Sequence, residues 1–231
     1  MESGGGYPHN SWRCIIDTLK KILANGWEGD YQTEVTIARP RFQEVIDAIP
    51  GYTMATFNHM YLLNSLVRET HARVYLEIGV WVGHSLLAAA IDNYHCKCIG
   101  VEDLSRHPDV ERLRQAEEIF PKNIDLVLLP FQTFFEKAEV ALKKGVVDVY
   151  YYDADHTTQG TYDGLVMAQP YLSDKCYVVV DDTEMSSVRK GVDQFLRTHA
   201  WKEVLRIDGE KTKEDHPHPW YNGVTILRRN A

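Results

Sequence analysis

Acidic residues follow two apolar runs of the chain, and they are the residues best suited to chemistry. Asp153, Asp155 and His156 come after the run 146–152, and Asp181 and Asp182 come after the run 176–180. A helix-length segment separates the runs, so they should be parallel neighbours joined by a right-handed crossover. Their carboxylates would then meet at the carboxyl edge of the sheet, where such sheets bind ligands. Because clustered carboxylates repel one another, we expect a divalent cation among them.

A glycine-containing turn follows an earlier apolar run. Residues 74–85 read Val-Tyr-Leu-Glu-Ile-Gly-Val-Trp-Val-Gly-His-Ser, and the next run ends at Glu102. Glycines at 79 and 83 let the backbone approach a ligand, and the helix start after them offers N–H groups to an anion. An acid at the second strand end typically binds ribose hydroxyls. The alternatives are a turn that serves packing alone and a solvated acid.

The elements that position these residues alternate between strand and helix from residue 73 onward. Apolar runs predict strands at 73–79, 97–102, 124–130, 146–153 and 175–182, and helical spacing predicts helices at 84–92, 109–120, 133–143, 158–169 and 186–199. Two further strands, 201–207 and 223–228, have no helix between them and should form an antiparallel hairpin. We therefore predict an α/β fold with a doubly wound, Rossmann-like seven-stranded sheet.

The first 70 residues lie outside this alternating pattern. We expect a flexible tail at 1–10 and an N-terminal helical cap at 11–70, with helix breaks at Gly26, Gly29 and Pro40. Apolar residues at helical spacing between Met60 and Val67 favour an amphipathic helix within the cap. The main domain would then span 71–231.

Composition limits the classes of function. The 231 residues carry a formal net charge of −8, which argues against nucleic acid as the main partner. No apolar run approaches membrane-spanning length, so we expect no membrane partner. The four cysteines lack zinc-site spacing. We expect a cytoplasmic protein with reduced thiols.

Together these motifs resemble the class I S-adenosylmethionine-dependent methyltransferases. The resemblance runs from Glu77-x-Gly79 through Trp81 to Gly83-x-Ser85, then to Glu102 and both acidic strand ends, and it covers about residues 50–229. The chain is most similar to metal-dependent small-molecule O-methyltransferases, such as the catechol and macrolide-sugar O-methyltransferases. The resemblance implies that 71–231 binds S-adenosylmethionine and that Mg²⁺ or another divalent cation assists methylation of a small-molecule hydroxyl of phenol or sugar type.

The resemblance also assigns roles to single residues. It implies cofactor contacts for Glu77, Gly79, Gly83, Ser85, Glu102, Gln132 and Asp153, and metal ligands at Asp153, Asp181 and Asp182. Gln132 lies in a stretch that departs from the family pattern. His156 stands where related enzymes carry a catalytic Lys or His, so we expect His156 to take the hydroxyl proton, with Asp153 beside it. The alternative is a histidine that caps a helix or supports a ligand. Asp155 ranks below Asp153 because a turn would send it elsewhere.

Several alternatives stay open at this point. The segment 208–221 could be a substrate lid or a second metal site, but a solvated hairpin loop is favoured. By analogy with the family, residues 52–54 could close over the cofactor. Rival functions are a non-catalytic S-adenosylmethionine-binding protein of the same fold and a different metal-dependent enzyme on the same sheet. The expected partner is a small-molecule hydroxyl substrate, and a homodimer stays open.

Overall fold

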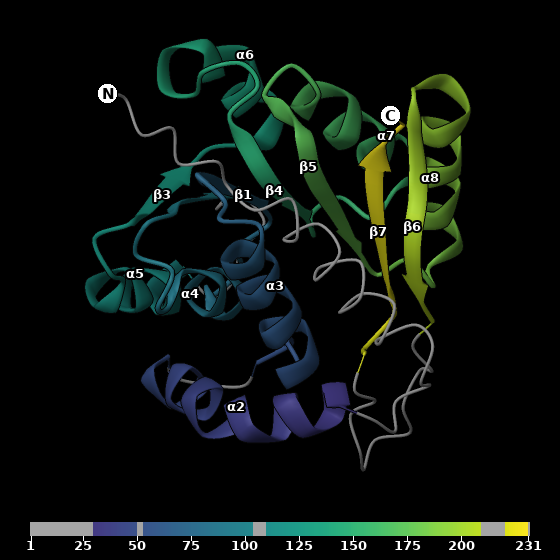
Figure 1. The fold of residues 1–231 in the computed structure, drawn as a ribbon. Helices are drawn as coiled ribbons and strands as arrows, with labels where there is room; N and C mark the ends of the chain where they lie inside the picture. Colours follow the sequence, from purple (N-terminus) through teal and green to yellow (C-terminus); the bar gives the residue numbers. More distant parts are fainter. Residues whose placement is uncertain (1–29, 50–52, 104–109, 209–219, 231) are drawn as a thin grey trace, which may run out of the picture.

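The computed structural model describes residues 30–49, 53–103, 110–208 and 220–230. Within them, seven strands form one sheet: β1 Val74–Ile78, β2 Lys97–Glu102, β3 Ile124–Leu128, β4 Val147–Tyr152, β5 Leu172–Asp181, β6 Trp201–Ile207 and β7 Val224–Arg229. Their order is β3-β2-β1-β4-β5-β7-β6 (Figure 1). β1 to β5 run parallel, and β7 lies antiparallel between β5 and β6. The predicted α/β fold and its final antiparallel hairpin are therefore confirmed.

Helices cover both faces of the sheet (Figure 1). They are α2 Asp30–Ala48, α3 Phe57–Glu69, α4 His84–Ala90, α5 Val110–Ile119, α6 Phe131–Ala141, α7 Thr158–Ala168 and α8 Ser186–Thr198. Buried side chains of α3, α4 and α5 pack on one face, and those of α6, α7 and α8 pack on the other. The two apolar layers leave the strand ends, where the acidic residues lie, as the place for a site.

Strand β4 is buried along its whole length. Side chains alternate between the two faces of a strand, so Tyr151 joins the apolar layer of α3 and α4, whereas Tyr150 and Tyr152 join that of α6 and α7. The three tyrosines therefore pack within the core. The hydroxyl of Tyr151 also reaches the site described below.

The N-terminal region differs from the expectation at Pro40. Helix α2 runs through this proline, so the predicted break there is wrong. A proline inside a helix removes one N–H donor at a cost of about 3 kcal/mol. Phe42 and Val45, which follow it, are buried against the core. Burial of a large apolar side chain contributes about 2 kcal/mol each, which offsets that cost.

The proposed division into a tail, a cap and a main domain stays a prediction. The tail at 1–10 and the breaks at Gly26 and Gly29 lie outside the described residues. Helix α3, assigned to the cap, shares an apolar cluster with β1 and β4. In the part of the chain that the structure describes, no helix is long and apolar enough to cross a membrane.

Candidate active site at the carboxyl edge of the sheet

The ends of β4 and β5 bring the acidic residues together. Tyr152 pairs with Val180 across these parallel strands, so Asp153 follows β4 at the level where Asp181 ends β5. Asp182 comes next, with a left-handed φ of +54°. This conformation is unusual for a residue other than glycine, and it persists where the surroundings hold it. The convergence expected from the sequence is therefore present in the fold.

Glycine at position 79 lets the turn after β1 pass close to Asp153. Gly79 has a φ of +90°, and a Cβ atom added to it would lie 1.7 Å from the carbonyl oxygen of Asp153. The backbone N–H of Asp153 in turn donates to the carbonyl of Ile78 at 2.9 Å. A side chain at position 79 would push the β1 turn away from the acidic strand end.

Three side chains form a group that could hold a cation. Ligand atoms of Asp153, His156 and Asp182 all lie within 4.8 Å of one another. His156 Nε2 is 3.0 Å from Asp182 Oδ2 and 3.5 Å from Asp153 Oδ1. Carboxylate oxygens suit a hard divalent cation, so the chemistry of this donor set fits Mg²⁺.

The electrostatics of the group show a shortage of positive charge. Burial, together with repulsion from Asp181 and Asp182, raises the pKa of Asp153, although His156 opposes that rise. The hydrogen bonds that His156 donates to Asp153 and then to Asp182 raise the pKa of His156 to about 10, against the effect of burial. His156 is therefore the cation that balances these carboxylates at neutral pH.

Asp181 faces a different set of partners. Its Oδ2 accepts a hydrogen bond from the Tyr151 hydroxyl at 2.5 Å, and its Oδ1 lies 3.2 Å from Nε2 of His59 on α3. Burial would raise the pKa of Asp181, but His59, Tyr151 and the Asp182 N–H together outweigh it and the pKa is lowered. The resemblance implied Asp181 as a metal ligand, which stays a prediction; in this structure its carboxylate contacts protein groups, and the group that could hold a cation is Asp153, His156 and Asp182.

A cavity of about 460 Å³ lies beside Asp153. Its volume is in the range of small-ligand sites. Four residues expected at the cofactor line it, namely Gly79, Glu102, Gln132 and Asp153. Glu102 Oε2 accepts a hydrogen bond from the backbone N–H of Trp81 at 2.7 Å, which fixes this carboxylate at the end of β2. Asp155 also lines the cavity, and its Oδ1 accepts from the N–H of Thr157.

The remaining residues expected at the cofactor lie elsewhere. Glu77 is fully buried, and its carboxylate oxygens accept hydrogen bonds from Tyr75 at 2.5 Å and Ser85 at 2.6 Å. Burial is the main cause that raises the pKa of Glu77 to about 8, although Ser85 and Tyr75 oppose it. A Cβ atom on Gly83 would meet the ring of Phe120 at 2.6 Å. Glu77 and Gly83 therefore pack beside the cavity and are not among its lining residues, and their role at the cofactor stays a prediction.

A second, smaller cavity of about 70 Å³ adjoins the first. Ser85, expected at the cofactor, lines this one. The two cavities share four lining residues: Met54, Trp81, Asp153 and His156. Asp181, Asp182 and Tyr221 line only the smaller one. The acidic group therefore stands where the two cavities meet.

The segment 208–221 differs from a solvated loop at its end. Residues 209–219 lie outside the described residues, but Trp220 is buried with its ring edge-to-face on His59, at a centroid distance of 5.1 Å. Tyr221 lines the smaller cavity. The favoured view of a solvated hairpin loop is wrong for Trp220, because apolar contact with α3 covers the indole, whereas Tyr221 is exposed.

His59 is the site residue that the sequence interpretation missed. It lies on the apolar stripe of α3 with Leu63 and Leu66, at spacings of four and seven residues, and it is buried. A histidine on such a stripe is a usable signal. Its partner Asp181 lies more than a hundred residues away in the sequence, so the pairing itself has no local pattern.

Comparisons with known proteins agree with this architecture. A family model described as a methyltransferase domain matches residues 76–183, from β1 to just beyond β5. No curated protein matches the chain. Similar solved structures include three methyltransferases, and identities this low show a shared fold: the O-methyltransferase from Bacillus cereus in complex with SAH (16% identity, 93% of this chain and 100% of that chain, TM-score 0.59), TomG from Streptomyces achromogenes in complex with SAM (16%, 88% and 91%, 0.58) and PaMTH1 from Podospora anserina bound to SAH (15%, 100% and 100%, 0.59).

The family match and the fold confirm the resemblance seen in the sequence. The matched segment begins within β1 and contains the turn at Gly79, Glu102 and both acidic strand ends. Residues 76–183 therefore match a methyltransferase domain, and the chain shares its fold with solved methyltransferases that bind SAM or SAH.

Proposed function

We propose that this protein transfers the methyl group of S-adenosylmethionine to a hydroxyl group of a small molecule, of phenol or sugar type, with the help of a divalent cation. The observation that carries the proposal is the junction of the two cavities at Asp153 and His156. A donor in the larger cavity and an acceptor in the smaller one would meet beside these two side chains. Holding two reactants in line at near-attack distance supplies much of the catalysis in such a reaction.

Asp153 and Asp182 are the residues that would hold the cation. Mg²⁺ is usually bound through one or two carboxylates and keeps several waters, so two carboxylates are a sufficient set. Mg²⁺, when bound, would replace the positive charge of His156 among the carboxylates and lower the pKa of the acceptor hydroxyl.

His156 would take the proton from the acceptor hydroxyl. A general base must be neutral and within hydrogen-bond reach of the proton. His156 lines both cavities, and its side chain is 42% exposed, so it can reach an acceptor and pass the proton to solvent. Its Nε2 lies 3.5 Å from Asp153 Oδ1, so the ring is already beside the cation site before a cation binds.

The larger cavity offers polar groups for the cofactor. Glu102 ends β2 with one oxygen bound to the Trp81 amide, which leaves Oε1 to accept hydrogen bonds from ribose hydroxyls. Gln132 and Phe131 stand at the start of α6 on the same cavity, a position that suits an adenine ring. Asp153 lines this cavity and the smaller one, so the methyl group would lie near Asp153.

An assay of methyl transfer tests the proposal. Protein stripped with EDTA would be incubated with methyl-labelled S-adenosylmethionine and a panel of phenolic, catecholic and sugar acceptors, with and without added Mg²⁺. We expect labelled product from a hydroxyl acceptor that depends on Mg²⁺. Full activity in excess EDTA would contradict the role of the cation. Calorimetric binding of S-adenosylhomocysteine without transfer to any acceptor in the panel would favour the non-catalytic rival.

A further inference from the structure

Asp181 differs from Asp153 and Asp182 because protein groups engage both of its oxygens. The Tyr151 hydroxyl donates to Oδ2 at 2.5 Å. Oδ1 accepts from the backbone N–H of Asp182 at 3.0 Å and lies 3.2 Å from His59 Nε2. Asp181 therefore links β4, α3 and the backbone of its own neighbour.

The ring of His59 is fixed from two sides. Its Nδ1 lies 3.0 Å from the hydroxyl of Thr56, the N-cap residue of α3, and Trp220 packs against the ring. Only 3% of the His59 side chain is exposed. Nε2 makes no hydrogen bond of good geometry to any described residue, so its approach to Asp181 is an ion pair. Nε2 must carry a proton, because a bare lone pair would repel the carboxylate.

We infer that His59 is a positioning residue for the cation site, acting through Asp181, which is itself not a ligand. The inference rests on the proposed function. Oδ1 of Asp181 contacts His59 and accepts a hydrogen bond from the backbone N–H of Asp182. His59 therefore fixes the carboxylate of Asp181, and this carboxylate fixes the backbone of Asp182. Asp182 needs that support because its φ is +54°. With the backbone fixed, the Asp182 carboxylate faces His156 and Asp153.

The competing arrangement makes Asp181 a ligand, and His59 then competes with the cation for it. The two arrangements predict opposite effects on cation affinity when the imidazole of His59 is removed. A positioning residue strengthens cation binding, whereas a competitor weakens it. Substitutions at His59 therefore separate them without a change to any proposed ligand.

The test compares His59→Gln with His59→Ala in the full chain after EDTA treatment. Mn²⁺ is titrated, and free Mn²⁺ is followed by electron paramagnetic resonance. Both substitutions remove the imidazole charge, but only glutamine can place an amide nitrogen against Asp181. We expect His59→Ala to bind Mn²⁺ about 10-fold more weakly than His59→Gln, as is typical when an outer support of a ligand is lost. Equal or tighter binding by His59→Ala would overturn the inference.

Asn64→Ala is the matched control. Asn64 is also buried on α3, where its amide donates to the carbonyls of Ala88 and Ile91, both at 2.8 Å. This variant should lose thermal stability and keep the Mn²⁺ affinity of the unsubstituted protein. A loss of Mn²⁺ affinity equal to that of His59→Ala would show general loosening of α3 and overturn the inference.

A second pair of variants covers the case in which His59→Ala does not fold. Asp181→Asn keeps Oδ1 for His59 and for the Asp182 amide, so we expect an Mn²⁺ affinity within about 3-fold of the unsubstituted protein. Asp182→Asn should lose about 10-fold or more. Equal losses would overturn the inference and leave the proposed function intact. Absence of Mn²⁺ binding by the unsubstituted protein would overturn both.

Discussion

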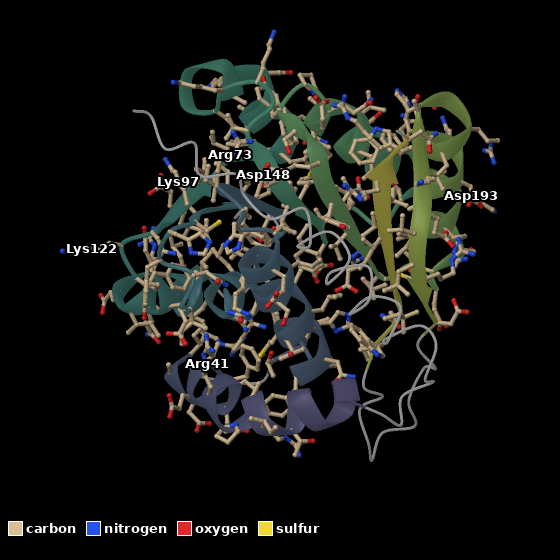
Figure 2. All side chains as sticks on the ribbon, in the orientation of Figure 1. Arg41, Arg73, Lys97, Lys122, Asp148 and Asp193 are labelled. Carbon is tan, nitrogen blue, oxygen red and sulfur yellow. The ribbon has the colours of Figure 1, made fainter. Side chains whose placement is uncertain are left out.

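Strand β4 has an aspartate at each end, and the charges of the two carboxylates are balanced differently: the Asp148 side chain is 1% exposed, whereas that of Asp153 is 34% exposed. Asp148 lies near the amino end of β4, where Figure 2 shows it beside Arg73. Its Oδ2 accepts from Arg73 Nε at 2.9 Å and from the Arg73 backbone N–H at 2.9 Å. Its Oδ1 accepts from Ser173 at 2.6 Å. These partners lower the pKa of Asp148, although burial opposes them.

Asp153, just past the other end of β4, has a raised pKa because burial and two further carboxylates outweigh its contact with His156. A buried carboxylate that accepts several hydrogen bonds, such as Asp148, stabilises the fold. Carboxylates that share one histidine, such as Asp153 and Asp182, leave a place for a cation. Residues of the first kind should affect stability, and residues of the second kind should affect activity.

Substitution of Asp153 should give the largest effect on activity. Asp153→Asn removes the residue shared by both cavities and by the cation group, so we expect kcat/KM to fall about 1000-fold, within the range for loss of a central catalytic group. The free energy of unfolding without metal should not decrease, because repulsion with Asp182 is relieved. Steady-state kinetics and urea denaturation measure both. Loss of stability with unchanged kcat/KM would contradict the assignment of Asp153 to activity and not to stability.

Substitution of Asp148 should give the reverse result. Asp148→Ala leaves the Arg73 and Ser173 donors without their acceptor, and we expect a loss of about 3 kcal/mol in the free energy of unfolding. Affinity for S-adenosylhomocysteine at 25 °C should stay within about 2-fold, since Asp148 is at the opposite edge of the sheet.

Asp125 offers the control for that substitution. Its side chain is 54% exposed and pairs with Lys97 at 2.7 Å. Such surface pairs contribute at most about 1 kcal/mol, so Asp125→Ala should change stability little. If Asp125→Ala and Asp148→Ala were equally destabilising, the hydrogen bonds of Asp148 would contribute no more to stability than an exposed ion pair does.

Substitution of His156 should reduce the rate of the chemical step alone. His156→Gln keeps a hydrogen-bonding side chain and removes the base, so kcat should fall about 100-fold, as general base catalysis typically supplies. Calorimetry should find the affinity for S-adenosylhomocysteine unchanged. A near-normal kcat in the presence of Mg²⁺ would assign His156 to helix capping or charge balance.

The dependence of stability on pH should give the smallest effect, and its sign should differ between the two ends of β4. The lowered pKa of Asp148 means that its contribution is present above about pH 4 and is lost as the pH falls through the folded pKa. The raised pKa of Asp153 means that metal-free folded protein takes up a proton before the unfolded chain does, so stability rises on acidification from neutral pH toward pH 4. Urea denaturation across pH measures both contributions. Asp148→Asn should remove the loss of stability at acid pH, and Asp153→Asn should remove the rise in stability between neutral pH and pH 4.

Much of the fold follows from local patterns. The strand ends at Asp153 and Asp181 and the glycine at position 79 lie where the apolar runs predict them, because parallel strands deliver their carboxyl ends to one edge. The hairpin of β6 and β7 follows from the missing helix between them. Pro40 was misjudged because its cost is local, whereas the packing that offsets it is tertiary.

The partners of each site residue were harder to predict. Glu77 resembles a cofactor contact by its motif, yet Tyr75 and Ser85 bind it inside the core. His59 and Trp220 are far from the acidic motifs in sequence and meet only in the folded chain. A motif predicts where on a strand or turn a side chain lies. The groups that its atoms bind depend on neighbours from distant parts of the sequence.

A crystal structure grown with S-adenosylhomocysteine and Mn²⁺ tests the central claim most directly, because manganese has its own anomalous signal. We expect one Mn²⁺ peak within about 2.0–2.3 Å of carboxylate oxygens of Asp153 and Asp182, with His156 moved off its ion pair and the cofactor in the larger cavity. Bound cofactor with no manganese peak at these carboxylates would contradict it.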